Sequence, residues 1–581
     1  MKKTNILFSS LTLISLLSGG KIQGKTSRNL NIIPYPNSLE MTLGHFNVAG
    51  ADFHITTEVD DLTLKAVTEF AERLSFDSGK ESKSYRDSQG PGFVFIKTDG
   101  LLSKEAYEIE ISKKSVTVRA SCFEGFFYAI QTLKQMLPVS IFGTVPSPDA
   151  KWELPCCKIS DYPRFSYRGT LLDVSRHYFT IEEIKRIIDI MAVYKKNILH
   201  WHLTDDQGWR IEIKKYPLLT EIGSKRLYTQ TLEGRNTSDR IPYGGFYTRE
   251  EIKDIVRYAA ERAITIIPEI DMPGHLISAM AAYPYLGCSG QSIEFGKEYQ
   301  VRTCWGIAKD VLCVGKETSY DFVCDVLDEV LEMFPSEYIH LGGDECPTES
   351  WEKCPDCQRL IKEVGLKATS AHSAESYLQT YFTAKMEKYL NDRGRRIIGW
   401  DEILTDKLSK STTVMSWTGE SNGIIAAKNG HDVVMTPYTY MYLNCRNTND
   451  IDNEPYGPHY SPIHTVYSYE PCTPDMTPVQ AQRIIGVQDC LWTEWIATPE
   501  HLEYMMLPRL AAASEVQWCE PTRKNYSSFK SRLPYHAKIY ESKGLTYCKG
   551  YMGLSGMPGK ERPIVPTSDF ERLGDVRVVK D

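Results

Sequence analysis

The chain has 581 residues, of which 42 % are hydrophobic and 24 % are charged, as is typical of a soluble globular protein. This length predicts two or three domains rather than one. The formal net charge of −8 is mild, and no basic run carries interleaved aromatic residues. Neither a nucleic acid nor a membrane surface is therefore expected as a partner.

The N-terminus has the layout of a secretory signal peptide. Two lysines, Lys2 and Lys3, precede an apolar stretch from Ile6 to Leu17, which small residues follow. This stretch is shorter than the roughly 20 apolar residues that a membrane-spanning helix needs. We expect residues 1–24 to be removed and the mature protein to be exported, to the periplasm or beyond it, without stable membrane insertion.

The region 25–160 is expected to form a small α+β domain. Residues 93–98, 106–112 and 115–120 alternate apolar and polar side chains, as half-buried strands do. An apolar-faced helix is predicted over 124–137.

From about residue 165 the pattern changes, and short apolar runs alternate with segments of helical period. Eight runs have the character of buried parallel strands: 167–175, 197–206, 264–272, 338–345, 395–403, 413–418, 432–437 and 486–494. The fold class predicted over 161–545 is therefore α/β, a (β/α)8 TIM barrel. A last helix is expected near 500–517, and 546–581, rich in Gly, Pro and charge, is expected to be an extended tail.

Acids and tryptophans gather at the carboxyl ends of these eight runs, where barrels of this kind carry their chemistry. They are Asp173, Asp205, Asp206, Glu269, Asp271, Asp344, Glu345, Trp400, Trp417, Trp492 and Glu494. Aromatic faces pack on sugar rings and carboxyl groups bind hydroxyls, so the set predicts a carbohydrate pocket.

The segment HLGGDE ends the fourth run with two adjacent acids, Asp344 and Glu345. Neighbouring side chains on an ideal strand point apart. An ordinary retaining glycosidase needs two carboxyl groups about 5–5.5 Å apart on opposite sides of the bond, and adjacent residues are badly placed for this. They suit a substrate-assisted reaction, in which one acid holds the sugar's 2-acetamido group and the other protonates the leaving oxygen. Gly342 and Gly343 allow the required kink.

Seven motifs, in order across about 160–520, resemble those of the β-N-acetylhexosaminidases of glycoside hydrolase family 20. They are RGTLLDVSRHY, LHWHLTDDQGWRIEI, GGFYT, IPEIDMPGH, HLGGDE, GWDEIL and LWTEW. The segment NIIPYPNSLE (31–40) is similar to the start of that family's non-catalytic N-terminal domain. The resemblance implies an exo-acting, retaining enzyme that removes terminal N-acetylhexosamine from glycans through an oxazoline, with no metal or organic cofactor.

Carried over by position, the resemblance also implies catalytic roles. Asp344 orients and polarises the acetamido group, Glu345 is the general acid and base, and Tyr442 donates a hydrogen bond to the acetamido oxygen. His275 and Asp205 form a hydrogen-bonded pair that tunes Glu345.

The substrate-binding residues follow in the same way. Arg168 and Glu494 are expected to hold the 3- and 4-hydroxyls. Three tryptophans are expected to wall the pocket: Trp400, Trp417 and Trp492. Asp206 is an alternative to Asp205 as the partner of His275.

One position departs from the family pattern. The residue two after Tyr442, usually Asp in this family, is Asn444 here, and Arg446 follows. Loss of a negative charge beside the sugar's 6-position is either neutral or suits a 6-sulfated N-acetylglucosamine.

Several alternatives stay open at this point. His200 and His202 in HWH suggest a metal-dependent amidohydrolase, although packing inside the barrel is the favoured interpretation. Asp173 and Arg176 are expected to form a structural salt bridge. A disaccharide-releasing lacto-N-biosidase and a non-catalytic carbohydrate-binding protein are further alternatives.

The chain has 15 cysteines, so at least one must stay unpaired within the chain. Cys354 and Cys357 form a C-x-x-C pair, with Cys346 close by. Such a pair is one corner of a zinc site, but the sequence supplies no convincing fourth ligand. A local disulfide or free loop thiols are the favoured interpretation, and no metal ligand is predicted.

Overall fold

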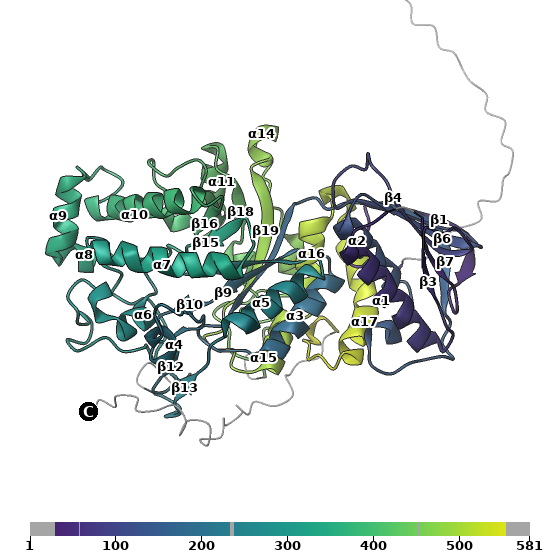
Figure 1. Cartoon of the computed structure of the whole chain (residues 1–581), viewed down its shortest axis with the longest axis horizontal. Coiled ribbons are helices and arrows are strands. Elements are labelled where there is room, and N and C mark those ends of the chain that lie inside the picture. The colour runs from purple at the N-terminus through teal and green to yellow at the C-terminus, as the bar shows by residue number, and fades with distance from the viewer. Residues whose placement is uncertain (1–29, 57, 233–236, 451–452, 553–581) are drawn as a thin grey trace, which may run out of the picture.

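The structure is a computed structural model that describes residues 30–56, 58–232, 237–450 and 453–552. The predicted signal peptide and most of the predicted tail lie outside these ranges. The N-terminal domain lies at one end of the molecule and the barrel at the other (Figure 1). Within the described ranges, no helix has the length and apolar character needed to cross a bilayer.

The N-terminal domain is a seven-stranded mixed sheet with two helices on one face (Figure 1). Its order is β1-β7-β5-β6-β4-β2-β3. The strands are β1 (Ser38–Asn47), β2 (Phe53–Ile55), β3 (Ser84–Arg86), β4 (Gly92–Lys97), β5 (Tyr107–Ile111), β6 (Ser115–Ala120) and β7 (Glu153–Asp161), and the helices are α1 (Asp61–Ser78) and α2 (Phe123–Lys134). Alternate side chains of β5 and β6 are buried, which confirms the predicted strand pattern.

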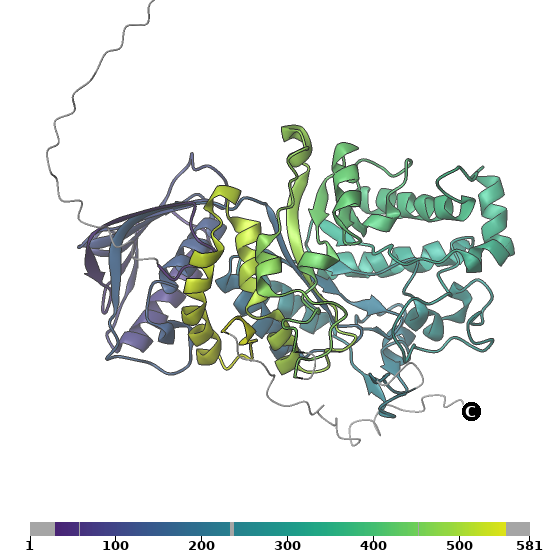
Figure 2. The same cartoon turned by 180° about the vertical axis from the view of Figure 1, so that it is seen from behind.

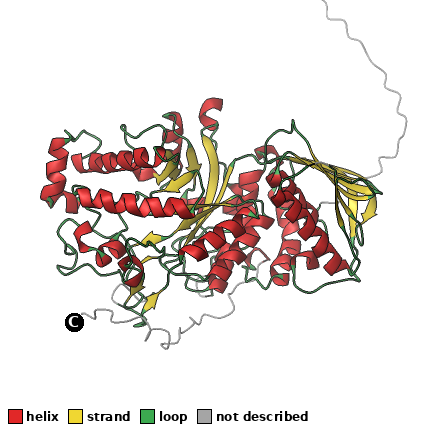
Figure 3. Cartoon of the chain, in the orientation of Figure 1, coloured by secondary structure: helices red, strands yellow, loops and turns green. Residues whose placement is uncertain are grey.

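Eight parallel strands of the described residues close into a barrel in the order β14-β15-β16-β17-β18-β19-β8-β9. They are β8 (Tyr167–Asp173), β9 (Ile198–His202), β14 (Thr265–Glu269), β15 (Tyr338–His340), β16 (Arg396–Trp400), β17 (Thr413–Ser416), β18 (Val433–Met435) and β19 (Ile484–Leu491). Each lies in, or overlaps, one of the predicted runs. The predicted TIM barrel is confirmed, and Figure 3 shows its strands enclosed by helices.

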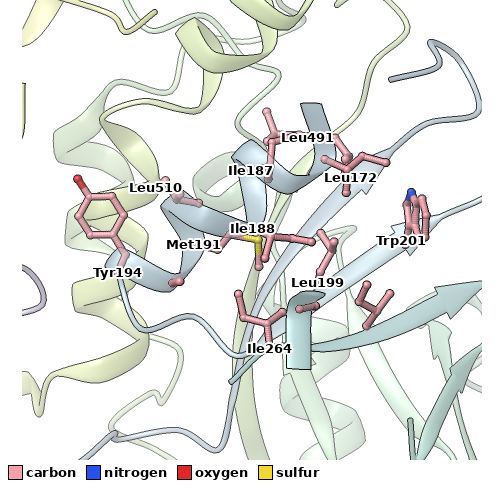
Figure 4. Packing of buried hydrophobic residues seen from close by; sticks show 14 of the residues in the cluster. Leu172, Ile187, Ile188, Met191, Tyr194, Leu199, Trp201, Ile264, Leu491 and Leu510 are labelled. Carbon is pink, nitrogen blue, oxygen red and sulfur yellow. The ribbon is translucent and has the colours of Figure 1, made fainter. Parts of the chain in front are cut away.

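The surrounding helices bury apolar stripes against the strands. They are α3 (Ile181–Val193), α5 (Arg249–Ala260), α7 (Glu317–Met333), α10 (Ala374–Asn391), α11 (Glu420–Lys428), α15 (Pro499–Met506) and α16 (Arg509–Trp518). Thr180 caps α3 in a capping box with Glu183. Ile187, Ile188 and Met191 of α3 then face strand and helix side chains (Figure 4). Burying each such side chain contributes about 1.5–3 kcal/mol.

Short strands and helices lie within the connections between the barrel strands and the surrounding helices. The short strands are β10 (Thr204–Asp205), β11 (Gly208–Trp209), β12 (Lys225–Arg226) and β13 (Tyr243–Gly244). The short helices are α4 (Leu218–Glu221), α6 (Ile277–Ala282), α8 (Glu349–Lys353), α9 (Pro355–Glu363), α12 (Tyr438–Met441), α13 (Ile463–Ser468) and α14 (Pro478–Ala481). Many of them follow a strand, so they enlarge the carboxyl face of the barrel.

The C-terminal part differs from the predicted single last helix. That segment is two helices, α15 and α16, which meet at Pro508, and a further helix, α17 (Tyr526–Ser542), follows. Helix α17 lies between the barrel and the N-terminal domain in both views (Figures 1 and 2). Its Tyr535 hydroxyl donates to the Leu137 carbonyl at 2.6 Å. The last described residues also pack against the protein, because Tyr547 and Cys548 are buried.

Candidate active site

A pocket of about 220 Å³ opens at the carboxyl ends of the barrel strands. It is lined by Arg176, Asp344, Glu345, Trp400, Trp417, Tyr438, Tyr442, Asn444, Pro458, His459, Trp492 and Glu494. Eight predicted site residues therefore line the same pocket, although they come from the ends of five different strands. Three predicted site residues, Asp205, His275 and Arg168, do not line it.

A glycine kink lets both adjacent acids reach this pocket. Gly342 and Gly343 have φ angles of 67° and 95°, and Glu345 has a φ of 46° in the left-handed region. A Cβ atom at position 342 would lie 1.7 Å from Asp271 Oδ1, so only glycine fits there. The Gly343 amide donates to the same oxygen at 3.1 Å. The kink replaces the strand alternation that would point Asp344 and Glu345 apart.

His275 lies beneath the two acids and links them to a buried carboxylate. Its Nε2 atom is 3.5 Å from Glu345 Oε2 and 3.8 Å from Asp344 Oδ2, and its Nδ1 atom is 3.1 Å from Asp205 Oδ1. Asp206, the alternative partner, is more distant at 3.8 Å. Burial alone would lower the pKa of His275, but the Asp205 carboxylate more than offsets this and raises it well above the usual range. His275 therefore lies between Asp205 and the two acids of the pocket, and its raised pKa favours the protonated ring.

Asp344 is largely enclosed and incompletely bonded. Its side chain is 13 % exposed, and its Oδ1 atom has no hydrogen-bond partner among the described residues. Burial, followed by the nearby charge of Asp271, raises the pKa of Asp344 well above its ordinary range. The unpaired Oδ1 atom is free to accept a hydrogen bond from a ligand when Asp344 is ionised.

Aromatic rings form the walls around these acids. Trp417 and Tyr442 are near-parallel, with ring centroids 6.1 Å apart and an interplanar angle of 17°. Trp492 lies 5.8 Å from Trp400 and 6.3 Å from Tyr442. The indole nitrogen of Trp492 is buried and has no hydrogen-bond partner in the described part of the chain.

A buried glutamate fixes the floor of the pocket. Glu269 accepts a hydrogen bond from the Trp400 indole at 2.8 Å and lies 2.5, 3.1 and 3.1 Å from ring nitrogens of His202, His200 and His340. Burial would raise the pKa of Glu269, but the facing histidines, His202 first, hold it well below the usual range. The predicted packing of His200 and His202 inside the barrel is confirmed.

The prediction that Arg168 holds the sugar is wrong. Arg168 is the second residue of β8 and therefore lies at the opposite, amino end of the barrel. Its side chain is 1 % exposed, and its guanidinium donates to Glu105 at 2.7 and 3.0 Å and to the Tyr128 hydroxyl at 3.0 Å. Arg168 thus joins the barrel to the N-terminal domain.

Arg176, the second arginine of the same motif, lies at the pocket instead of Arg168. It follows the carboxyl end of β8 and lines the pocket beside Glu494. The predicted bond to Asp173 is present at 3.2 Å, and a second bond reaches Asp205 at 2.7 Å. Arg176 is therefore both part of a salt bridge and a pocket residue.

Sequence reasoning missed three further groups. Glu402 accepts the Glu345 amide at 3.2 Å and the Trp417 indole at 2.8 Å, so it positions one catalytic candidate and one wall. Its signal is present in the motif GWDEIL, directly after the strand end. Tyr438 and His459 also line the pocket, but His459 lies in an irregular loop without a readable pattern.

A larger cleft of about 1160 Å³ lies at the other end of the barrel. It runs between the N-terminal domain and the amino ends of the strands, and Glu105, Asn197 and Ile485 are among its lining residues. Barrel enzymes carry their chemistry at the carboxyl face, so size alone does not make this cleft the active site.

Two family profiles match the chain and divide it at the same place as the fold. Residues 165–521 match the catalytic domain of glycosyl hydrolase family 20, and residues 29–162 match domain 2 of the same family.

Named relatives agree with this assignment. The chain is 39 % identical over 554 residues to a beta-hexosaminidase of Porphyromonas gingivalis, covering 94 % of this chain and 67 % of the relative. It is 35 % identical to a beta-hexosaminidase of Vibrio furnissii, covering 85 % and 77 %.

Solved structures share the fold. A GH20 exo-beta-N-acetylglucosaminidase from Vibrio harveyi, in complex with N-acetylglucosamine, superposes with a TM-score of 0.76 at 33 % identity, covering 90 % of this chain and 78 % of that one. A GH20 beta-N-acetylhexosaminidase from Streptomyces coelicolor gives 0.76 at 28 % identity, covering 90 % and 97 %. The chain belongs to glycosyl hydrolase family 20, and it is a glycoside hydrolase related to the beta-hexosaminidases.

Proposed function

We propose that this protein is an exo-acting, retaining β-N-acetylhexosaminidase that removes terminal β-linked N-acetylglucosamine from glycans by substrate assistance. The observation that carries the proposal is the kinked turn after β15. It delivers Asp344 and Glu345 from adjacent positions into one aromatic-walled pocket.

The first half of the reaction forms an oxazoline. Glu345 gives its proton to the glycosidic oxygen, and the 2-acetamido oxygen of the bound sugar attacks the anomeric carbon as the bond to the leaving group breaks. Asp344, whose Oδ1 atom lacks a partner, accepts the acetamido N–H and stabilises the positive charge that develops there. Tyr442 donates to the acetamido oxygen from the facing wall.

The second half regenerates the enzyme. Glu345, now ionised, takes a proton from water as the water attacks the anomeric carbon and the carbon–oxygen bond of the oxazoline breaks. Two inversions at one carbon retain the β configuration. The cationic His275, 3.5 Å from Glu345, stabilises the ionised form of Glu345 between the two halves.

The size of the pocket supports removal of one sugar at a time. Its volume of about 220 Å³ is below the roughly 300–1,000 Å³ of pockets that enclose drug-sized ligands, and it suits a single pyranose. Arg176 and Glu494 provide a charged pair for the ring hydroxyls at the closed end. A disaccharide-releasing lacto-N-biosidase needs more room in the same place.

The decisive experiment compares two nitrophenyl substrates, the β-N-acetylglucosaminide and the matched β-glucoside, which lacks the acetamido group. We expect strong turnover of the first and none of the second. Equal turnover would mean that an enzyme carboxylate is the nucleophile. Silence on both would instead favour a disaccharide-releasing enzyme, a sulfate-requiring enzyme or a binding protein.

A 6-sulfated N-acetylglucosamine is a second, finer candidate substrate. The pocket wall around Asn444 carries an amide, and the neighbouring lining residues Tyr438, Pro458 and His459 add no carboxylate. A sulfate there meets no like charge from these residues. If Asn444→Asp leaves the ratio of sulfated to plain turnover unchanged, this substrate is rejected, while the hexosaminidase proposal stands.

A further inference from the structure

Four cysteines from distant parts of the chain meet beside the barrel. Their sulfur atoms, those of Cys288, Cys313, Cys354 and Cys357, all lie within 4.8 Å of one another. The Sγ–Sγ distance from Cys313 is 3.6 Å to Cys354 and 3.7 Å to Cys357. All four are free thiols in the structure.

Three backbone segments hold these cysteines in place. Cys288 follows the short 3₁₀ helix Pro284–Leu286, Cys313 precedes α7, and Cys354 and Cys357 bracket the first turn of α9. The Cys313 amide donates to the Leu286 carbonyl at 2.8 Å, which pairs the first two segments.

The third segment approaches the second unusually closely. A Cβ atom at Gly315 would lie 2.3 Å from the carbonyl carbon of Asp356 and from the amide nitrogen of Cys357. Only glycine permits this approach, so the backbone as well as the cysteines is shaped to bring the sulfurs together.

The spacing of the sulfurs fits a tetrahedral metal rather than disulfides. A zinc ion bound to thiolates at about 2.3 Å sets its ligand sulfurs about 3.8 Å apart at the edges of a tetrahedron. The observed 3.6 and 3.7 Å are close to that edge. A disulfide places its two sulfurs about 2.05 Å apart. Cys313 is nearly equidistant from two sulfurs and is paired with neither.

We propose that Cys288, Cys313, Cys354 and Cys357 bind a structural Zn²⁺ ion. Four protein thiolates complete the tetrahedron and leave no open position, as in structural rather than catalytic zinc sites. Three of the cysteines are buried and Cys288 is half-buried, so the site is shielded but reachable during folding.

The surroundings suit a zinc–thiolate centre, which carries a net negative charge. The Lys316 ammonium lies against the same loop and donates to the carbonyls of Tyr285 and Gly287 at 3.0 and 2.7 Å. The indole of buried Trp351 donates to the Leu312 carbonyl, next to Cys313, at 2.9 Å. Such contacts orient the ligand-bearing backbone.

The four cysteines lie between two loops that carry the catalytic candidates. The proposed zinc site joins the long connection after β14, which carries His275, to the connection after β15, which carries Asp344 and Glu345. The Leu312 amide also donates to the Pro273 carbonyl at 2.9 Å, two residues before His275. A metal here stabilises the two loops that form the reaction centre while taking no part in the reaction.

Metal analysis of the purified full-length protein tests the proposal. We expect about one zinc per chain by mass spectrometry of the elements, and loss of that zinc with a lower Tm in Cys313→Ser and in Cys357→Ser. Cys324→Ser, a half-buried cysteine of α7 outside the cluster, is the matched control and should keep both zinc and Tm. Replacement of zinc by Co²⁺ should give the charge-transfer absorption of a tetrahedral cobalt thiolate.

Measurements on the unaltered protein keep the test decisive where a variant fails to fold. Titration of the thiols with an organomercurial reagent should release about one zinc ion per chain, read with a zinc-sensitive dye. A wild-type protein without zinc, or disulfides among these four cysteines in non-reducing peptide mapping, would overturn the proposal. Iron in place of zinc would overturn the assignment of the metal. None of these outcomes depends on the substrate of the enzyme.

Discussion

The two ends of the barrel differ in how completely their buried polar groups are paired. At the amino end, Arg168 and Lys195 are almost completely enclosed, yet each has several partners. All three guanidinium nitrogens of Arg168 donate hydrogen bonds, to Lys195, Phe165, Glu105 and Tyr128. The Lys195 ammonium lies 3.2 Å from Asp161 and donates to the Tyr107 hydroxyl at 2.7 Å.

At the carboxyl end, several buried polar atoms have no hydrogen-bond partner within the described ranges. Three of them belong to residues that line the pocket: Asp344 Oδ1, Asn444 Oδ1 and Trp492 Nε1. Buried polar atoms are almost always paired, so a cluster of unpaired ones needs an explanation. The contrast separates a fully bonded structural interface from a pocket whose unpaired atoms are available to a ligand.

The largest expected effect comes from Asp344→Asn, which tests the unpaired end. We expect kcat/KM on the nitrophenyl N-acetylglucosaminide to fall by roughly 10³-fold, because the developing charge loses its carboxylate. The raised pKa of Asp344 means that the folded state loses stability as pH rises from an ordinary Asp value through the folded value. Above that range the variant should therefore have a higher Tm than the wild type.

Thermal denaturation at two pH values checks whether the variant gains stability while it loses activity. The gain in Tm should shrink as the pH is lowered toward the ordinary Asp range. A variant that loses both activity and Tm at high pH would show that Asp344 is a structural residue like those at the amino end.

Arg168→Ala tests the paired end. Removing one member of a buried ion pair leaves Glu105 without its partner, so the free energy of unfolding should fall by about 3–5 kcal/mol. KM should stay unchanged. Urea denaturation measures the free energy of unfolding, and initial rates measure KM. Arg393→Ala, which breaks a solvent-exposed pair with Asp328, should cost at most about 1 kcal/mol.

Glu494→Gln tests the carboxyl end of the barrel with a variant whose expected loss of activity is smaller. It keeps the shape of the side chain but replaces charged hydrogen bonds to the sugar, worth about 1.5–3 kcal/mol, by neutral ones. Neutral hydrogen bonds are worth about 0.5–1.5 kcal/mol, so the difference of about 1–1.5 kcal/mol should lower kcat/KM about 5- to 13-fold, with stability nearly unchanged. Glu500→Gln, an exposed acid in the first turn of α15, is the control. Equal losses in the two variants would remove Glu494 from the binding site.

The smallest effect concerns pH. Asp344 must be ionised to hold the acetamido group, and its raised pKa should move the acidic limb of kcat/KM above the ordinary range of an aspartate. The charge of Asp271 contributes to this shift, so Asp271→Asn should move that limb toward lower pH. An unmoved limb would mean that another group controls it.

The sequence predicted the barrel well because buried parallel strands are continuous apolar runs. It also predicted the acids of the pocket, since a strand's carboxyl end marks where they must lie. It failed for Arg168, because one motif contains two arginines and only the position along β8 decides which end each reaches. It missed α17, whose pattern is interrupted by Pro534.

The cysteine cluster shows a different limit. Cys354 and Cys357 were visible as a local pair, but Cys313 lies 41 and 44 residues before them in the chain. Cys288 lies further back still. Ligands that tertiary structure brings together carry no signal in sequence spacing, so Cys288 and Cys313 were found only from the fold, and Cys346 is not one of the four.

The salt bridge between Arg168 and Glu105 has a consequence for how this enzyme folds. The first strand of the barrel depends on a carboxylate of the N-terminal domain, and α17 reaches back to the same domain through Tyr535. We therefore expect the two parts to unfold cooperatively, although a boundary between them is visible along the chain. A barrel expressed alone would expose a buried cation and an apolar interface, so the two parts should melt in a single transition and be engineered as one unit.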